Sequence, residues 1–160
     1  MNNKKPHKND LITEFTIYNR HLPHWQSPNS VYFITTRCIK GTDLTPEYRE
    51  IVMDSIHYLD GKKYALYAAV ILTDHFHLII QPMEKARDAY YSLPEIMHGI
   101  KSFTAHKVGK PLWQHENFDR IIRNKGELFE KINYMLKNPV KAGLVGDYTA
   151  YKWLFYIGKE

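Results

Sequence analysis

The sequence lacks the features that mark secreted, membrane-spanning and nucleotide-hydrolysing proteins. It has one cysteine, Cys38, which can form no internal disulfide and no cysteine-rich zinc site. The longest largely apolar run, 64–72, is far shorter than the roughly 20 residues that span a bilayer. The basic N-terminus is not followed by the apolar stretch of a signal peptide, and no phosphate-binding glycine motif is present. We therefore expect a cytoplasmic protein that needs no nucleotide cofactor.

What is present is the composition of one globular domain. The 160 residues are 44% hydrophobic and 24% charged, with a formal net charge of +5. Residues 1–100 carry eleven basic and eleven acidic side chains, whereas residues 101–160 carry eleven basic and six acidic ones. The whole positive excess lies in the last 60 residues, so an anionic partner is expected to bind there.

The pattern of apolar and turn-forming residues predicts an α+β fold, a single domain with a central, largely antiparallel sheet flanked by helices. Strands are expected at 31–38, 63–73 and 75–81, and helices at 46–60, 93–108 and 127–137. Asn138-Pro139 is expected to end the third helix, and 113–123 to be irregular or strand-like. We assign 1–28 to an irregular N-terminal arm, 29–153 to the domain and 154–160 to a short tail.

Two histidines are a candidate metal pair. His75 and His77 stand two residues apart in a predicted strand, so their side chains point to the same face, while Phe76 and Leu78 point to the other. Two imidazoles on a rigid strand are half of a metal site, and imidazole suits several divalent metals. Nine histidines would produce roughly half such a pair by chance, so a half-exposed strand face remains the alternative.

Tyr134 and Asn138 form a second candidate pair, on the third predicted helix. Their spacing of four residues places them together on its polar face, opposite an apolar stripe of Leu128, Ile132, Met135 and Leu136. A surface tyrosine followed by a helix-ending Asn-Pro would look the same. Both interpretations therefore stay open.

The C-terminal part of the chain alternates cations with aromatic side chains. Such a surface suits a single-stranded nucleic acid, because cations neutralise phosphates and aromatic rings stack on bases. A solvated basic face over an ordinary core is the alternative. The candidate DNA-binding residues are Lys101, Trp113, Arg120, Arg123, Lys131 and Lys141.

Taken together, these motifs resemble the REP-associated tyrosine transposases of the HUH single-strand transposase superfamily. The resemblance covers roughly residues 18–153 in the family's order. Two stretches depart from the family pattern: Thr73-Asp74 stands where Pro-Asn is common, and Trp153-Leu154-Phe155 where Trp-Ser-Ser is common. The matching motifs are His75-Phe76-His77, Trp113-Gln114, Phe118-Asp119-Arg120-Ile121-Ile122-Arg123 and the string from Tyr134 to Val145, with 20–26, 32–35 and 101–105 in support.

The resemblance implies a ferredoxin-like or RRM-like HUH core and a role for each candidate residue. His75, His77 and Asn138 would bind a divalent metal, Mg²⁺ or Mn²⁺, and Tyr134 would be the nucleophile. The implied activity is metal-dependent cleavage and rejoining of single-stranded DNA at palindromic hairpins through a 5′-phosphotyrosine, in the cytoplasm of a bacterium, at its nucleoid.

Two other functions remain open from the sequence. One is a hairpin-binding protein derived from such a transposase but without catalysis, and the other is a metal-dependent hydrolase that releases a free 5′-phosphate. The sequence also leaves open a monomer or a homodimer, since relatives of the fold include dimers that exchange the tyrosine helix.

Overall fold

The computed structural model describes residues 22, 23, 25 and 29–159. Most of the arm expected at 1–28 therefore lies outside the described residues. The part that is described contacts the domain: Pro23 is buried, and Leu22 and Trp25 pack against the hydrophobic core.

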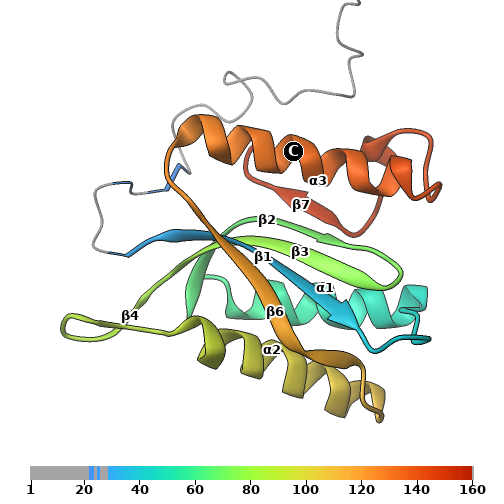
Figure 1. The fold of residues 1–160 in the computed structure, drawn as a ribbon, viewed down its shortest axis with the longest axis horizontal. Helices are drawn as coiled ribbons and strands as arrows, with labels where there is room; N and C mark the ends of the chain where they lie inside the picture. Colours follow the sequence, from blue (N-terminus) through green and yellow to red (C-terminus); the bar gives the residue numbers. More distant parts are fainter. Residues whose placement is uncertain (1–21, 24, 26–28, 160) are drawn as a thin grey trace, which may run out of the picture.

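A five-stranded antiparallel sheet forms the centre of the molecule (Figure 1). Its strand order is β6-β1-β3-β2-β7, so β3, with the histidine pair, is the central strand. A separate two-stranded hairpin, β4 (Glu84–Ala86) and β5 (Ala89–Tyr90), projects from one end. The strands of the main sheet are β1 (Val31–Cys38), β2 (Tyr64–Ile71), β3 (His75–Pro82), β6 (Trp113–Ile122) and β7 (Leu154–Tyr156).

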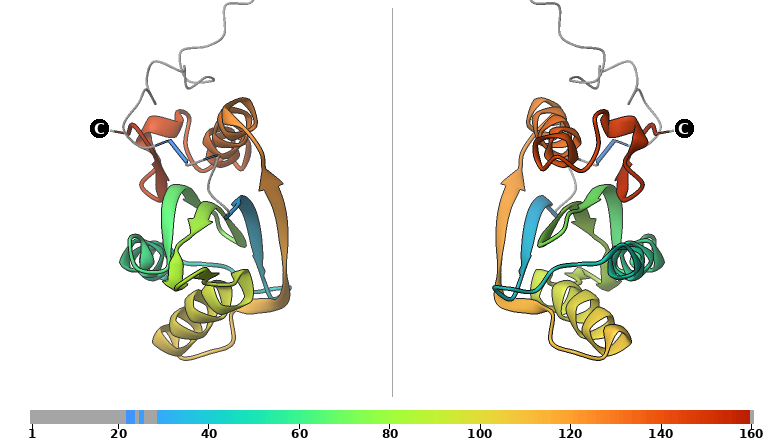
Figure 2. Two further views of the ribbon diagram at one scale, coloured as in Figure 1. Left: turned by 90° about the vertical axis from the view of Figure 1, so that its left-hand side faces the viewer. Right: turned by 90° about the vertical axis from the view of Figure 1, so that its right-hand side faces the viewer.

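Helices cover both faces of this sheet (Figure 2). Helices α1 (Pro46–Leu59) and α2 (Leu93–Val108) pack on one face, and α3 (Lys125–Lys141) packs on the other, followed by the short 3-10 helix η1 (Tyr148–Ala150). Each face has its own core, and on the α3 side it includes the predicted stripe of Leu128, Ile132, Met135 and Leu136. The predicted α+β fold is confirmed.

The central strand is buried on both faces. Phe76 and Leu78 point into the core beneath α1 and α2, whereas His77 and Ile79 point towards α3. His77 is only 3% exposed. The alternative of a half-exposed strand face is therefore wrong at His77, because α3 covers that face.

The predicted boundaries differ from the structure mainly in the C-terminal third. Residues 113–122 form a full edge strand, β6. Leu154–Tyr156, which we assigned to a short C-terminal tail, pairs with β2 as strand β7. The prediction that Asn138-Pro139 ends the third helix is wrong. Helix α3 continues to Lys141 with Pro139 inside it, and the amide of Ala142 still bonds to the carbonyl of Asn138 at 2.9 Å. Asn138 consequently keeps a helical position.

Candidate metal and nucleophile site

His77 is held in the middle of the sheet, and only one of its two ring nitrogens has a partner within the described part of the chain. Its Nδ1 lies 2.8 Å from the Oγ1 of Thr35, its direct neighbour on β1. Its Nε2 is buried and has no hydrogen-bond partner among the described residues. Burial, together with the charges of His75, Arg37 and Lys131, lowers the pKa of His77 to about 3. The imidazole is therefore neutral at physiological pH and can act as a ligand.

His75 stands beside it, at the start of β3 and closer to solvent. The two imidazole centroids are 4.9 Å apart, as the same-face prediction requires. The Nδ1 of His75 lies 2.6 Å from Oδ1 of Asp74, the residue that closes the β2–β3 turn. A carboxylate accepts and cannot donate, so this hydrogen bond places the Nδ1 proton on His75.

Helix α3 brings Tyr134 onto the same pair of histidines. The phenol ring lies 5.5 Å from the His77 ring and 6.1 Å from Phe33, both edge-on. The Nζ of Lys131 lies 5.0 Å from the Phe33 ring centroid and 5.7 Å from that of Tyr134. Tyr134 nevertheless stays 44% exposed, so its phenol is accessible from solvent.

Asn138 supplies a second buried polar atom without a partner. Its Oδ1, like Nε2 of His77, has no hydrogen-bond partner among the described residues. Helix α3 runs antiparallel to β3 (Figure 1), so the turn after Tyr134, where Asn138 lies, is nearer the His75 end of the strand. Buried polar atoms are nearly always satisfied in native proteins. The site therefore holds two buried polar atoms without a hydrogen-bond partner among the described residues.

The tyrosine and asparagine thus differ from their predicted setting. They share a helix face, as expected, but this face borders the sheet and is not a fully solvated polar face.

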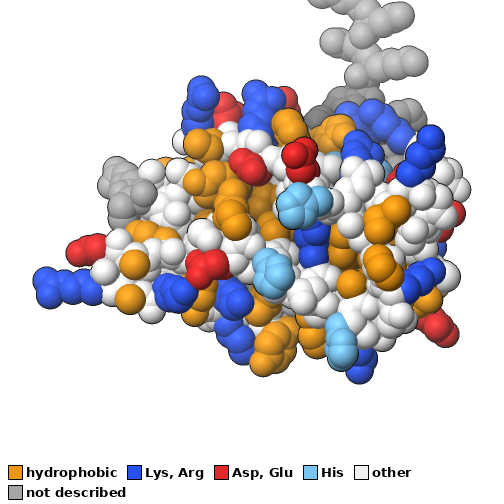
Figure 3. Space-filling view, turned by 60° about the horizontal axis from the view of Figure 1, so that its bottom comes forward, with side chains coloured by type: hydrophobic (Ala, Val, Ile, Leu, Met, Phe, Trp, Pro, Cys, Tyr) orange, Lys and Arg blue, Asp and Glu red, His pale blue; other side chains and the backbone are white. Residues whose placement is uncertain are grey.

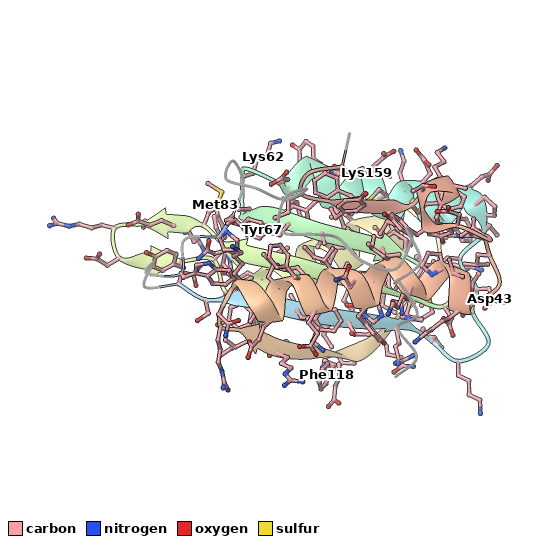
Figure 4. All side chains as sticks on the ribbon, turned by 90° about the horizontal axis from the view of Figure 1, so that it is seen from above. Asp43, Lys62, Tyr67, Met83, Phe118 and Lys159 are labelled. Carbon is pink, nitrogen blue, oxygen red and sulfur yellow. The ribbon has the colours of Figure 1, made fainter. Side chains whose placement is uncertain are left out.

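An open strip of sheet lies beside α3. Seen from above, β6 lies to one side of the helix and is not beneath it, with Phe118 at that edge (Figure 4). Phe118 is directly opposite Thr35, and Arg120 directly opposite Phe33, so both side chains point to the α3 side of the sheet. Both are exposed, Phe118 by 62%. A row from Phe118 through Thr35 to His77 therefore leads from an exposed aromatic ring into the site.

One cation next to the histidines, Arg37, has no signal in the sequence. Arg37 is directly opposite His75 across β1 and β3, shares its face and is exposed. It comes from the part of the chain with no net charge, so charge counting could not single it out. Only the pairing register of β1 with β3 reveals it.

Two of the candidate DNA-binding residues have structural roles. The ammonium of Lys101 on α2 donates to the backbone carbonyl of His115 at 2.9 Å and to that of Gln114, and its partial burial lowers its pKa. Trp113 is 9% exposed, and its Nε1 donates to Oγ1 of Thr104 at 2.8 Å. Trp113 is a core residue and presents no face for stacking on a base.

Of the other candidates, Lys131 is half-buried and the arginines and Lys141 are exposed, but not all of them lie close to Tyr134. Arg123 and Lys141 stand at opposite ends of α3, Arg123 just before the helix and Lys141 in its last turn. Lys131 and Arg120 lie nearer to the tyrosine, through Phe33. The exposed cations therefore extend along the whole length of α3.

A hollow of about 820 Å³ lies on the opposite side of the sheet, between α2 and β6. Met97, His98, Trp113 and Glu116 are among its lining residues. Figure 3, which views the α2 side, shows acidic, basic and histidine side chains mixed with apolar ones on this face. It carries no concentration of positive charge, and the sheet separates it from the histidine pair.

The described residues lack a cluster of metal-ligating side chains and a membrane-spanning helix. No group of three or more His, Cys, Asp or Glu side chains that could hold a metal is found among them. A metal at the histidine pair would thus need a different third ligand, such as the amide oxygen of Asn138. No helix within the described ranges is long and apolar enough to cross a bilayer.

Comparison with known proteins points to one fold. No protein-family model matches the sequence, and no curated protein sequence matches it. Among solved structures, a REP-associated tyrosine transposase bound to a REP hairpin matches with a TM-score of 0.67 and 21% sequence identity. The match covers 86% of this chain and 80% of that one. At this identity the likeness establishes that the two chains share a fold.

Proposed function

We propose that this chain is a REP-associated tyrosine transposase that cleaves and rejoins single-stranded DNA at hairpin sites. The observation that carries the proposal is the packing of an exposed tyrosine, Tyr134, 5.5 Å from the buried ring of His77. The shared fold with a transposase supports it, as does the set of sequence motifs. The assignment to the wider HUH superfamily also rests on Tyr134 and His77.

The residues present fit a divalent metal. His75, His77 and Asn138 would hold it, because Nε2 of His77 and Oδ1 of Asn138 are buried and have no hydrogen-bond partner in the part of the chain that the structure describes. A set of two imidazoles and one amide oxygen suits Mn²⁺ and is compatible with Mg²⁺ completed by water. When bound, such an ion supplies Lewis-acid polarisation of a phosphate oxygen and helps to orient the phosphate.

The chemical step would be a transesterification at Tyr134. The phenol oxygen forms a bond to the scissile phosphorus while the bond from phosphorus to the 3′ oxygen breaks, and the phenol proton balances the 3′-hydroxyl that is released. The product is a 5′-phosphotyrosine, and rejoining is the reverse reaction with another 3′-hydroxyl. Lys131, 5.7 Å from the ring centroid, places positive charge beside the phenol. The phosphodiester bond energy is conserved, so no nucleotide cofactor is required.

DNA would lie along the open strip of β6 and the exposed side of α3. Arg37 and Arg120 flank the histidines and the Phe33 ring, and Lys131 stands above that ring. Exposed Phe118 offers a face on which an unpaired base can stack. Backbone contacts of this kind set affinity and register, whereas base contacts set the sequence choice.

The test is covalent adduct formation with a labelled single-stranded hairpin oligonucleotide, using palindromes that flank the chain's own gene. With Mn²⁺ we expect a denaturation-resistant protein–DNA adduct and a free 3′-hydroxyl. The adduct is expected to disappear with EDTA and in Tyr134→Phe. Tyr58→Phe is the matched control, because Tyr58 is also exposed but lies on α1, across the sheet.

Other outcomes would support the other functions. Binding that survives EDTA, with no cleaved product under any metal, indicates a hairpin-binding protein without catalysis. Cleavage that yields a free 5′-phosphate and no adduct indicates a hydrolase. An adduct that persists in Tyr134→Phe would show that the nucleophile is assigned wrongly.

A further inference from the structure

Both histidines of the site are bound through the same ring atom, by partners from different elements. Nδ1 of His75 lies 2.6 Å from the Asp74 carboxylate, and Nδ1 of His77 lies 2.8 Å from the Thr35 hydroxyl. Asp74 is exposed in the β2–β3 turn, with 59% of its side chain accessible, whereas Thr35 is buried on β1 at 8%. In both histidines, Nε2 is therefore the ring nitrogen that takes no part in these contacts.

The two partners limit which proton each imidazole can carry. Asp74 can only accept, so His75 carries a proton on Nδ1, and the only nitrogen of its ring that can offer a lone pair is Nε2. The hydroxyl of Thr35 can accept as well as donate. If it donated, Nε2 of His77 would hold a proton, and a buried N–H would have no acceptor. If it accepts, Nε2 of His77 presents a lone pair instead, which is the state that a metal needs.

From this geometry we propose that Asp74 and Thr35 are positioning residues, which fix both histidines with the proton on Nδ1 and aim both Nε2 lone pairs at one metal ion. The proposal rests on the function proposed above and extends it to residues outside the ligand set. Such outer partners fix the ring orientation and raise the basicity of the ligand nitrogen.

The two positioning residues differ in what they contribute. Thr35 is neutral and rigid, because it sits on β1 directly opposite His77 in the sheet. Asp74 adds a negative charge next to His75 and stands at the turn. The chain carries this aspartate where the resembling family commonly has asparagine. The stronger hydrogen bond of a carboxylate would strengthen His75 as a ligand.

The first test observes the tautomers directly in the metal-free protein. Nitrogen-15 chemical shifts and long-range couplings of the imidazole rings distinguish a proton on Nδ1 from one on Nε2. We expect Nδ1–H for both His75 and His77. In Thr35→Val we expect His77 to lose this preference while His75 keeps it, and a Nε2–H form of either ring in the wild type would overturn the proposal.

The second test measures Mn²⁺ affinity, by calorimetry or by electron paramagnetic resonance of free Mn²⁺, without DNA. Asp74→Ala and Thr35→Val are expected to weaken binding by about 10- to 100-fold. Thr35→Ser, which restores the hydroxyl, is expected to bind like the wild type, and Asp74→Asn to fall between the wild type and Asp74→Ala. Asp54→Ala removes another exposed carboxylate, on α1, and serves as the control.

The outcomes separate this inference from the proposed function. If the wild type binds Mn²⁺, and His77→Ala abolishes binding while Asp74→Ala and Thr35→Val bind within about twofold of the wild type, the positioning roles are wrong and the metal site stands. If the wild type binds no Mn²⁺ or Mg²⁺, the metal site itself fails, and the positioning roles fail with it.

Discussion

At the scale of single residues, the environment of a lysine decides its role more than its place in the sequence does. Lys131 projects over the Phe33 and Tyr134 rings at the edge of the site. Lys101 instead joins α2 to β6 through carbonyls of Gln114 and His115, and it can also reach Oδ1 of Asn117 at 3.4 Å. Two residues of equal charge, both in the basic region, thus have different functions.

We expect Lys101→Met to destabilise the fold without removing a DNA contact. Methionine keeps most of the apolar stem but leaves the β6 carbonyls without their charged donor, at a cost of about 1 to 3 kcal/mol. Chemical denaturation measures the loss, and Lys107→Met, exposed in the last turn of α2, is the control. Equal stability of the two variants, or a large loss of DNA affinity in folded Lys101→Met, would contradict this role.

Cys38 is a buried free cysteine. It lies in the core on the α1 and α2 side, and burial, followed by the charges of Asp74 and Asp43, raises the pKa of its thiol to about 12. At pH 8 its thiolate fraction should be about 10³-fold below that of a free thiol. We therefore expect Ellman's reagent to modify Cys38 rapidly only after unfolding, and fast reaction of the native protein would contradict its buried placement.

At the scale of elements, α3 is the part that positions Tyr134, the nucleophile of the proposed reaction. The buried apolar stripe of α3 packs on the sheet, and Tyr134 and Asn138 lie on the helix beside that stripe. Met135, next to the tyrosine in sequence, is fully buried in the α3 core. Met97 occupies a comparable buried position in α2, on the other face.

These two methionines allow a matched comparison. Met135→Ala and Met97→Ala should each lower the free energy of unfolding by about 2 to 5 kcal/mol, because each leaves a cavity. Only Met135→Ala should also slow adduct formation, measured under conditions where both variants are folded. Equal adduct rates for the two would show that the seating of α3 does not control Tyr134.

The elements that were predicted well have local signals. Thr45 caps α1, with Pro46 as its first residue, and Gly109 ends α2 in a left-handed conformation at φ 85°. The end of α3 was predicted wrongly because the helix continues through Pro139, which lacks only its own amide donor and is buried. The sequence contains no local signal for β7, because its three residues form a strand only by pairing with β2.

The candidate site was predictable only in part, for the same reason. The same-face arrangement of His75 and His77 follows from strand geometry, and the pairing of Tyr134 with Asn138 follows from helix geometry. The neighbours Thr35, Arg37 and Phe118 come from register between strands that are distant in sequence. No local pattern encodes that register.

At the scale of the whole molecule, the positive excess of the last 60 residues is divided between two faces. Lys101, Lys107 and Lys110 belong to α2 and its end, while Lys152 pairs with Glu50 at 3.0 Å. The cations on α3 or beside it include Arg37 from the neutral part of the chain and, from the last 60 residues, Arg120, Arg123, Lys125, Lys131, Lys137 and Lys141. The charge count therefore overstated the share of the positive excess that lies near the candidate site.

The salt dependence of DNA affinity should distinguish cations near the site from cations elsewhere on the molecule. Arg120→Ala is expected to reduce the slope of log affinity against log salt by about 0.7 to 0.9, the value of one lost phosphate contact. Arg87→Ala, in the turn of the β4–β5 hairpin, changes net charge equally and should leave the slope unchanged. The same slope change in both variants would mean that only net charge matters.

The central claim is that Tyr134, alone among the twelve tyrosines, becomes covalently linked to DNA. The most direct measurement is to form the adduct with a hairpin oligonucleotide and Mn²⁺, digest protein and DNA, and locate the nucleotide-bearing residue by mass spectrometry. We predict one modified residue, Tyr134, joined to a 5′-phosphate. A nucleotide on any other side chain, or cleaved DNA with no modified peptide, would contradict the account.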